Sequence, residues 1–194
     1  MKYELPTTLN IGGIDYKIRG DGDYRIVLDT FSVLEDTNLN KTERITLALC
    51  IFYDFVEDIS DLNEFSDIEE AAEKMFKFFD AGKPEGRVHN NLKLLDWDDD
   101  CTMVCAAINK VANVEVRELP YLHWWTFVTY YMSIGESTLS TVVSIREKMS
   151  KGKKLEKWER DYRQENPEYF SWKSKTADDI DFERQLLAQW DSEG

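Results

Sequence analysis

The 194-residue sequence contains few of the residues that build disulfide-linked or metal-bound scaffolds, with only three cysteines and two histidines. An odd number of cysteines in apolar, helix-like surroundings indicates buried, reduced thiols rather than a disulfide framework. A structural zinc site uses a second pair of closely spaced ligands, which the single pair Cys101 and Cys105 does not provide. The sequence therefore predicts neither a bound metal nor a cofactor.

The sequence also lacks a long hydrophobic run. The longest apolar stretch, about residues 119–134, is shorter and more interrupted than the roughly 20 residues that span a membrane. Residues 1–6 lack the apolar region of a signal peptide. We therefore expect a soluble, intracellular protein that does not enter a membrane.

Positive charge is scarce, because 24 Lys and Arg stand against 38 Asp and Glu, for a formal net charge of −14. Nucleic-acid phosphates require a basic surface, so the class of general nucleic-acid binders is disfavoured. The charges are also segregated. Residues 54–73 hold nine acidic and no basic residues, whereas residues 146–163 hold eight basic and four acidic ones, a local charge of +4. Such segments are either solvated helix faces or opposite patches that guide self-association or partner docking.

The residues that are abundant indicate one mainly α domain. With 42% hydrophobic and 13% aromatic residues, the chain can bury a core of ordinary size. Residues 9–18 alternate in polarity about a Gly-Gly pair, which predicts a β-hairpin. Beyond it we expect a single helical domain of about seven helices. The predicted division is an N-terminal β-hairpin arm at 1–20, a helical domain at 21–170 and a C-terminal helical extension at 171–194.

Capping residues and apolar spacing predict where the helices begin and end. The predicted starts are Asp23, the capping box Asn40 with Glu43, the box Ser66 with Glu69, the acidic stretch 96–100, Pro120 and Ser137. The predicted ends are about residue 55, Gly82 followed by Pro84, about residue 112, Gly135, and Asn166 with Pro167. Leu155, Trp158 and Tyr162, at spacings of three and four, predict the apolar stripe of one further helix. A last helix is expected from about residue 177.

Residues 121–131 are the most apolar helix-like segment, with six aromatic rings in eleven residues. Each ring can bury roughly 150–250 Å², so this segment must face a core or a partner. A helix that is apolar all round is normally central to the core. Since successive helical residues are rotated by about 100°, Trp124 and Trp125 cannot face one layer, and at least one of them should be a core residue.

Catalytic patterns are missing. Asp96, Asp98 and Asp100 fit the first positions of a calcium loop, but Cys101 stands where glycine is needed and Ala107 where glutamate is needed. We interpret the aspartates as an acidic helix start, and a metal-dependent phosphodiesterase built on them remains an alternative. The sequence has no P-loop, dinucleotide fingerprint or nucleophile elbow, so we expect a protein that is not an enzyme.

The order of several motifs resembles a known phage family. The motifs are Leu-Pro-Thr-Thr-Leu-Asn-Ile-Gly-Gly-Ile-Asp-Tyr-Lys-Ile at 5–18, Asp-Tyr-Arg at 23–25, Phe-Phe-Asp-Ala-Gly-Lys at 78–83, Asp-Trp at 96–97, Tyr-Leu-His-Trp-Trp-Thr-Phe at 121–127, and Val-Ser-Ile-Arg at 143–146 before a Lys-rich helix. Together they are similar to the bacteriophage "gp fifteen" family of tailed phages and prophages of Gram-positive bacteria. The resemblance covers about residues 3–170. It departs at Thr126, where a basic residue is usual after the tryptophan pair.

This resemblance implies a gene in the tail module, just before the gene for the tape measure protein. That is the position of tail assembly chaperones, which keep the long tape measure helix soluble and help to recruit tail tube subunits. The implied partners are the tape measure protein and the tail tube protein, with a homo-oligomer as a further expectation. The implied location is the cytoplasm of the infected or lysogenic host. The family supplies no catalytic residues.

A chaperone for an amphipathic partner needs exposed apolar surface with a polar rim. The candidate partner-binding residues are Trp124, Trp125, Phe127, Tyr131, Arg146, Lys153, Lys154 and Lys157. Two other functions remain open, an acidic DNA mimic that inhibits a host protein and a structural component of the tail. Residues 54–73 motivate the mimic, and the basic segment 146–163 argues against it.

Overall fold

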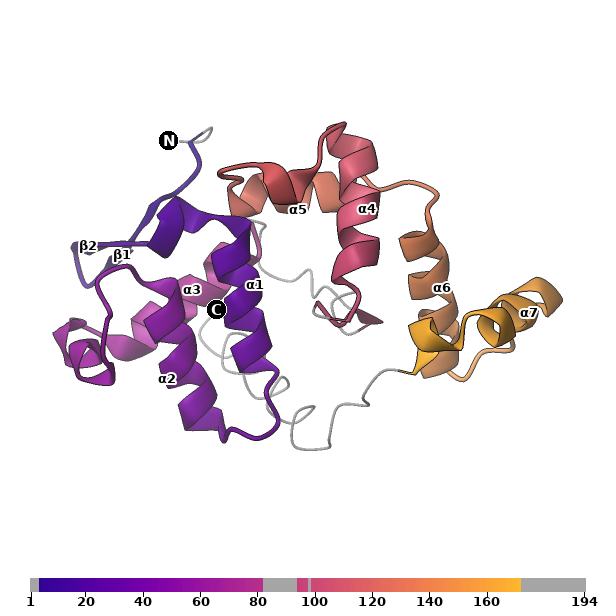
Figure 1. Cartoon of the computed structure of the whole chain (residues 1–194). Helices are drawn as coiled ribbons and strands as arrows, with labels where there is room; N and C mark the ends of the chain where they lie inside the picture. The colour runs from indigo at the N-terminus through magenta and orange to yellow at the C-terminus, as the bar shows by residue number, and fades with distance from the viewer. Residues whose placement is uncertain (1–3, 82–93, 98, 172–194) are drawn as a thin grey trace.

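A computed structural model describes residues 4–81, 94–97 and 99–171 of the chain. Within these residues it contains seven α-helices, one antiparallel strand pair and short 3-10 helices (Figure 1). The predicted mainly α fold class with a small N-terminal hairpin is confirmed. The main elements are β1 (Thr8–Ile11), β2 (Ile14–Lys17), α1 (Tyr24–Leu34), α2 (Lys41–Phe52), η2 (Ile59–Glu64), α3 (Ile68–Phe79), α4 (Cys101–Ala112), α5 (Trp124–Met132), α6 (Thr138–Ser150), α7 (Lys157–Glu165) and η5 (Pro167–Phe170).

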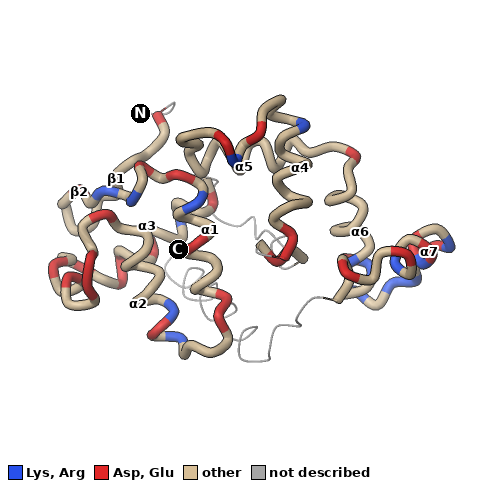
Figure 2. Tube along the Cα trace, viewed as in Figure 1, with Lys and Arg blue, Asp and Glu red and all other residues tan. Residues whose placement is uncertain are grey.

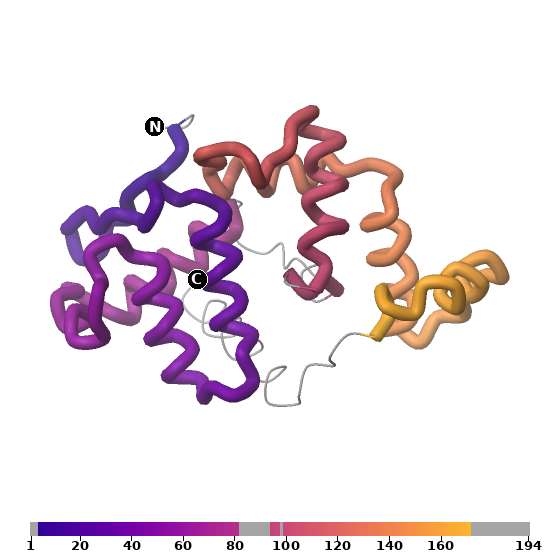
Figure 3. Tube along the Cα trace, in the orientation of Figure 1, coloured from indigo at the N-terminus to yellow at the C-terminus, as the bar shows by residue number. Residues whose placement is uncertain are grey.

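The helices form two groups that α5 connects. The hairpin, α1, α2 and α3 lie together on one side, and α6 and α7 lie on the other (Figures 1 and 3). Helix α5 packs against both α1 and α4, and α4 packs against α6. A single buried cluster runs from Ile11 in the hairpin to Val142 in α6, so the two groups share one core. Among the described helices, none is long and apolar enough to cross a membrane.

The hairpin forms because its turn demands glycine. Strands β1 and β2 pair in antiparallel register, with Leu9 opposite Tyr16. Gly12 and Gly13 both have positive φ, at 56° and 87°, which the tightest hairpin turns require. A Cβ at Gly12 would also lie 2.4 Å from the Ser66 hydroxyl, so the turn packs closely on the start of α3. The predicted hairpin is confirmed.

Three predicted helix starts are confirmed by their hydrogen bonds. The Asp23 carboxylate accepts from the Arg25 N–H at the start of α1. Asn40 and Glu43 form the reciprocal capping box of α2. Ser137 accepts from the Ser140 N–H and opens α6. In each case the partners are at most three residues apart, so local sequence is sufficient.

Two other predicted starts are wrong. Asp67, not Ser66, caps α3, because the Ser66 hydroxyl donates to the Ile11 carbonyl of the hairpin instead. Pro120 lies in the loop before α5, which begins only at Trp124.

The predicted start of α4 after the acidic stretch is confirmed, since the helix begins at Cys101 with Asp100 as its N-cap residue. Its first turn holds no acidic residue, however, and Asp100 makes no capping hydrogen bond. The Asp100 carboxylate instead forms a buried ion pair with Arg146, described below.

Two helices end earlier in the sequence than predicted, and the predicted end of another is confirmed. Helix α2 ends at Phe52, earlier than residue 55, since Tyr53 is already extended and pairs with Ile18 as an isolated β-bridge. Helix α5 ends at Met132, before Gly135. Helix α3 ends at Phe79, and the predicted stop signals at 82 and 84 lie outside the described residues. The end of α7 at Asn166 is confirmed, and the helix expected from about residue 177 lies outside the described residues.

The predicted apolar stripe of α7 is wrong in two of its three positions. Leu155 precedes the helix, which begins at Lys157. Trp158 is 56% exposed, whereas the neighbouring Glu159 is buried. Glu159 accepts hydrogen bonds from Lys148 Nζ at 2.6 Å and from the Glu156 N–H at 2.7 Å. Helix α7 therefore directs a paired carboxylate, rather than the indole, toward α6.

Candidate functional site

Helix α5 is fixed at its N-terminus by His123. The buried imidazole accepts the Trp125 N–H on Nδ1 at 3.0 Å, which makes His123 the N-cap. Because Nδ1 accepts, the ring is neutral and its Nε2 donates to the Pro6 carbonyl at 3.0 Å. Burial lowers the pKa of His123 below its ordinary value. One side chain therefore ties the N-terminal segment to the start of the aromatic helix.

Protonation of His123 should weaken the fold. The lowered pKa means that His123 contributes stability above the ordinary histidine value of about 6.5, and that this contribution is lost as the pH falls below it. Asparagine at this position retains an N-cap acceptor but does not titrate. Between about pH 7.5 and about pH 5, the wild type should lose free energy of unfolding relative to His123→Asn. Denaturant melts of both proteins at both pH values measure this difference, and equal changes would contradict the assignment.

The loop before α5 is bound to the start of α1. The Asp23 carboxylate accepts from the Leu122 N–H, and the Leu122 carbonyl accepts from the Tyr24 N–H, each at 2.9 Å. The Arg25 guanidinium pairs with Asp23 at 3.1 Å and also donates to the Leu119 carbonyl at 2.7 Å. Residues about 100 positions apart in sequence are thereby held together, and the orientation of α5 is set.

The tryptophan pair closes the C-terminus of α3. Trp124 Nε1 donates to the Phe79 carbonyl and Trp125 Nε1 donates to the Phe78 carbonyl, both at 2.9 Å. The last carbonyls of a helix have no α-helical partner within it. The Phe79 carbonyl accepts from Trp124, and the Phe78 carbonyl accepts from Trp125 in addition to the Ala81 N–H. Trp124 is buried and Trp125 is half-buried. The prediction that at least one of the pair is a core residue is confirmed.

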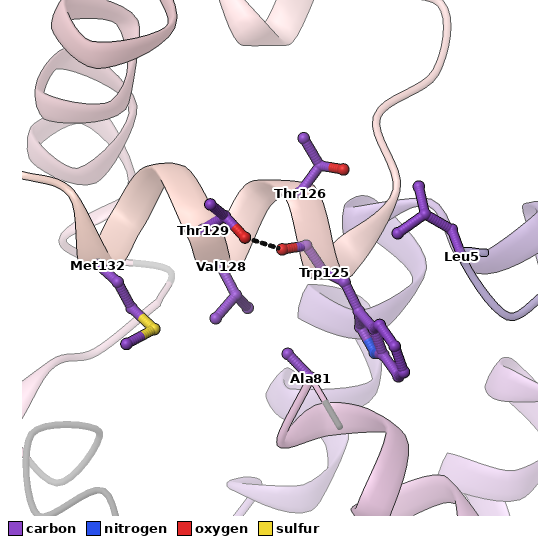
Figure 4. A pocket seen from close by; sticks show the side chains of 7 residues that line it. All are labelled: Leu5, Ala81, Trp125, Thr126, Val128, Thr129 and Met132. Carbon is purple, nitrogen blue, oxygen red and sulfur yellow. Dashed lines mark hydrogen bonds between the residues drawn. The ribbon is translucent and has the colours of Figure 1, made fainter. Parts of the chain in front are cut away.

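The outer face of α5 forms an apolar groove of about 340 Å³ (Figure 4). Trp125, Val128 and Met132 line it along the helix, and Leu5 and Ala81 come from the N-terminal segment and the end of α3. The two threonines of the same helix, at 126 and 129, add polar atoms to the lining. Met132 is 57% and Leu5 45% exposed, so the groove presents apolar side chains to solvent. Its apolar lining suits the apolar side of another molecule.

The other candidate residues lie in two different environments. Phe127 is buried and stacks on Tyr24, with ring centroids 4.6 Å apart. Tyr131 is half-buried against Trp97, at 5.9 Å, and burial raises its pKa to about 12. Arg146 is buried, as described below. Lys153, Lys154 and Lys157 are exposed on the α6–α7 side. Trp124, Phe127 and Arg146 thus offer no surface to a partner in this conformation, and the groove and the three lysines form separate surfaces.

Residues 1–171 match the family described as Bacteriophage Gp15 protein. The chain belongs to this family. The match covers all described residues and the aromatic, groove-lining helix. No curated protein and no solved structure shows significant similarity to the chain. Its site must therefore be understood from its own residues.

The buried Arg146 of this Gp15-family chain is a structural residue. It pairs with Asp100, and the two side chains are each only 3% exposed. Its guanidinium also donates to the Leu94 carbonyl at 2.9 Å and to the Tyr169 carbonyl at 2.8 Å. One side chain on α6 thus joins the start of α4, the segment before it, and η5. The sequence placed Arg146 in a basic surface segment, and nothing local distinguished it from its neighbours.

The acidic stretch and the thiols show no catalytic arrangement in the described part of the chain. Asp100 is engaged by Arg146, Asp96 accepts from the Asp99 N–H at 2.9 Å, and residue 98 lies outside the described residues. Among the described residues, no three acidic, cysteine or histidine side chains are grouped to hold a metal ion. Burial raises the pKa of Cys105 to about 12, so this thiol stays protonated and unreactive.

The groove residues Leu5, Val128 and Met132 were not among the predicted site residues. A signal for part of the groove exists in the sequence, since Trp125, Val128 and Met132 follow helical spacings of three and four. This spacing marks one face of a helix. It does not reveal that the opposite face, with Trp124 and Phe127, is the one that enters the core.

Proposed function

We propose that this Gp15-family protein is a tail assembly chaperone that binds the tape measure protein through the groove on α5. The observation that carries the proposal is the groove itself, an apolar helix face left open to solvent beside polar side chains. An amphipathic helix that lays its apolar side into such a groove is a common mode of recognition. The long helix implied for the tape measure protein is a partner of this kind.

The proposal includes three further points. The protein acts by binding and not by catalysis. It acts in the cytoplasm of the bacterial host, where the tail is assembled, and tail tube subunits are a second partner. Trp125 contributes to the groove directly, while Trp124 and Phe127 hold the helix in place from the core side.

Charged side chains placed in the groove should abolish capture of the tape measure protein. We expect Leu5→Glu/Met132→Glu to weaken binding at least tenfold, about 1.4 kcal/mol, because two carboxylates must be desolvated against an apolar partner. Both side chains are exposed, so the fold should be retained. Co-expression with the tape measure protein of the same phage, followed by affinity purification on a tagged tape measure protein, measures the effect.

A matched control changes the same number of exposed apolar residues elsewhere. Ile14 at the start of β2 is 54% and Val114 after α4 is 41% exposed, and neither lines the groove. Ile14→Glu/Val114→Glu adds the same charge and should leave capture unchanged. Equal capture by the groove variant, the control and the wild type would refute the groove as the binding site. No capture by the wild type would refute the proposed partner.

A further inference from the structure

The basic arm, residues 148–163 of α6, α7 and their connection, lies at one end of the molecule (Figures 1 and 2). It carries Trp158, whose indole is 56% exposed. An exposed tryptophan within a charged rim has the composition of a protein-binding hot spot. The exposed indole is not explained by the α5 groove, because no residue of the arm lines that groove.

The positive charge of the arm is not neutralised within the arm. Two of its lysines have partners, since Lys148 pairs with the buried Glu159 and Lys151 pairs with Glu147. Lys154 and Lys157 are exposed and form no ion pair with any other residue in the described ranges. The arm therefore presents an exposed indole beside unpaired ammonium groups.

The opposite end of the molecule has a complementary composition. The acidic end, residues 57–69 of η2 and the start of α3, exposes Ile59 at 57% and Ile68 at 45%. Glu57 and Glu64 in the same segment are exposed, and neither has an ion-pair partner in the part of the chain that the structure describes. Apolar side chains stand here beside carboxylates, whereas the arm combines an indole with ammonium groups.

We propose that the basic arm of one copy docks on the acidic end of a second copy, with Trp158 packed against Ile59 and Ile68. Figure 2 shows the Lys-rich and Asp- and Glu-rich segments on opposite sides of the molecule, so one copy does not bring its own two surfaces together. A contact between two different surfaces is heterologous, and a bound pair of copies leaves one basic arm and one acidic end open. Such contacts close into a ring or continue as a filament.

The composition of the acidic end favours a second copy over a polyanion as the occupant of the arm. With a net charge of −14, the chain repels nucleic acids, anionic membranes and further copies alike at long range. At short range the acidic end of a second copy offers exposed Ile59 and Ile68 to the indole as well as carboxylates to the lysines, and opposite patches fix the orientation of docking. The proposal does not depend on the tape measure protein, because neither surface includes the α5 groove.

Sedimentation velocity on the purified full-length chain tests this association. We expect the wild type to associate with rising concentration at about 0.05 M salt and to dissociate at about 0.5 M salt, where exposed charges are screened. Lys154→Glu/Lys157→Glu and Glu57→Lys/Glu64→Lys should each weaken self-association at least tenfold. All four side chains are exposed and without an ion pair in the described chain, so circular dichroism should confirm an unchanged fold.

Mixing the two variants gives the decisive result. The arm-reversed variant retains a native acidic end, and the acid-reversed variant retains a native arm. These two native surfaces should restore association in the mixture, which each variant lacks alone. The two reversed surfaces also have opposite charges and attract each other nonspecifically. Trp158→Ala in the acid-reversed variant removes the indole from the native contact alone, so it should weaken the mixed association if that contact forms.

Matched controls separate the contact from net charge. Lys157→Glu and Lys110→Glu alter net charge equally, and exposed Lys110 lies on α4, outside both surfaces. Only Lys157→Glu should reduce self-association of the wild type. A wild type that stays monomeric at about 0.05 M salt, or equal effects of the two lysine variants, would overturn the proposal.

Discussion

Asp100→Ala should lower the free energy of unfolding by about 3–5 kcal/mol, because it removes the Asp100 carboxylate from the buried Arg146 guanidinium. Both side chains are only 3% exposed, so water cannot replace the lost carboxylate. The carbonyls of Leu94 and Tyr169 still accept from Arg146, but they carry no full charge. Urea unfolding followed by circular dichroism measures the loss.

Two controls define the contribution of this ion pair. The double variant Asp100→Leu/Arg146→Met removes both charges and should be more stable than Asp100→Ala, since no buried charge is left unpaired. Glu147 is the residue after Arg146, and Glu147→Ala breaks only an exposed pair with Lys151, so it should change stability little. If Asp100→Ala costs no more than Glu147→Ala, the carbonyls alone satisfy Arg146.

Trp124→Ala should also cost about 3–5 kcal/mol, through a cavity in the core. The buried indole contacts Phe31, Trp97 and Phe127, with ring centroids between 5.6 and 6.3 Å. The substitution also removes the hydrogen bond to the Phe79 carbonyl and so leaves the end of α3 without that partner. Unfolding by urea, followed by circular dichroism so that the lost fluorophore does not matter, measures the change.

The neighbouring tryptophan is the natural comparison for this effect. Trp125 makes the equivalent bond to the Phe78 carbonyl but is only half-buried and lines the groove. Trp125→Ala should therefore cost less stability than Trp124→Ala and should weaken capture of the tape measure protein. Trp124→Phe restores ring volume without the donor and should lie between the wild type and Trp124→Ala. Equal stability losses at both positions would contradict this division of roles.

Local interactions made part of this fold predictable from sequence. The Gly12–Gly13 turn and the Asn40–Glu43 box depend on backbone conformation and on partners at most three residues away. The aromatic segment could be assigned to a helix with a core face from its composition alone. Backbone conformation, hydrogen bonds between near neighbours and apolar composition are all local properties, so a single sequence is sufficient to identify these features.

The candidate site was less predictable, because exposure is not a local property. The sequence predicted Trp124, Trp125 and Phe127 alike as partner-binding residues. Their contacts with the α3 carbonyls and with Tyr24 show which of them are core residues and which lines the groove. Leu5 joins the groove from more than 100 residues away, held near by the bond between Pro6 and His123.

The mainly helical fold, the N-terminal hairpin and the segregation of charge along the chain could all be inferred from the sequence. Which charges and which rings are buried depends on contacts between distant parts of the chain. Arg146 is enclosed because Asp100, 46 residues earlier, meets it in the core, while Trp158 is exposed because Glu159 takes the inward position beside Lys148. A buried charge needs a partner of opposite charge, and chain folding alone determines where that partner lies.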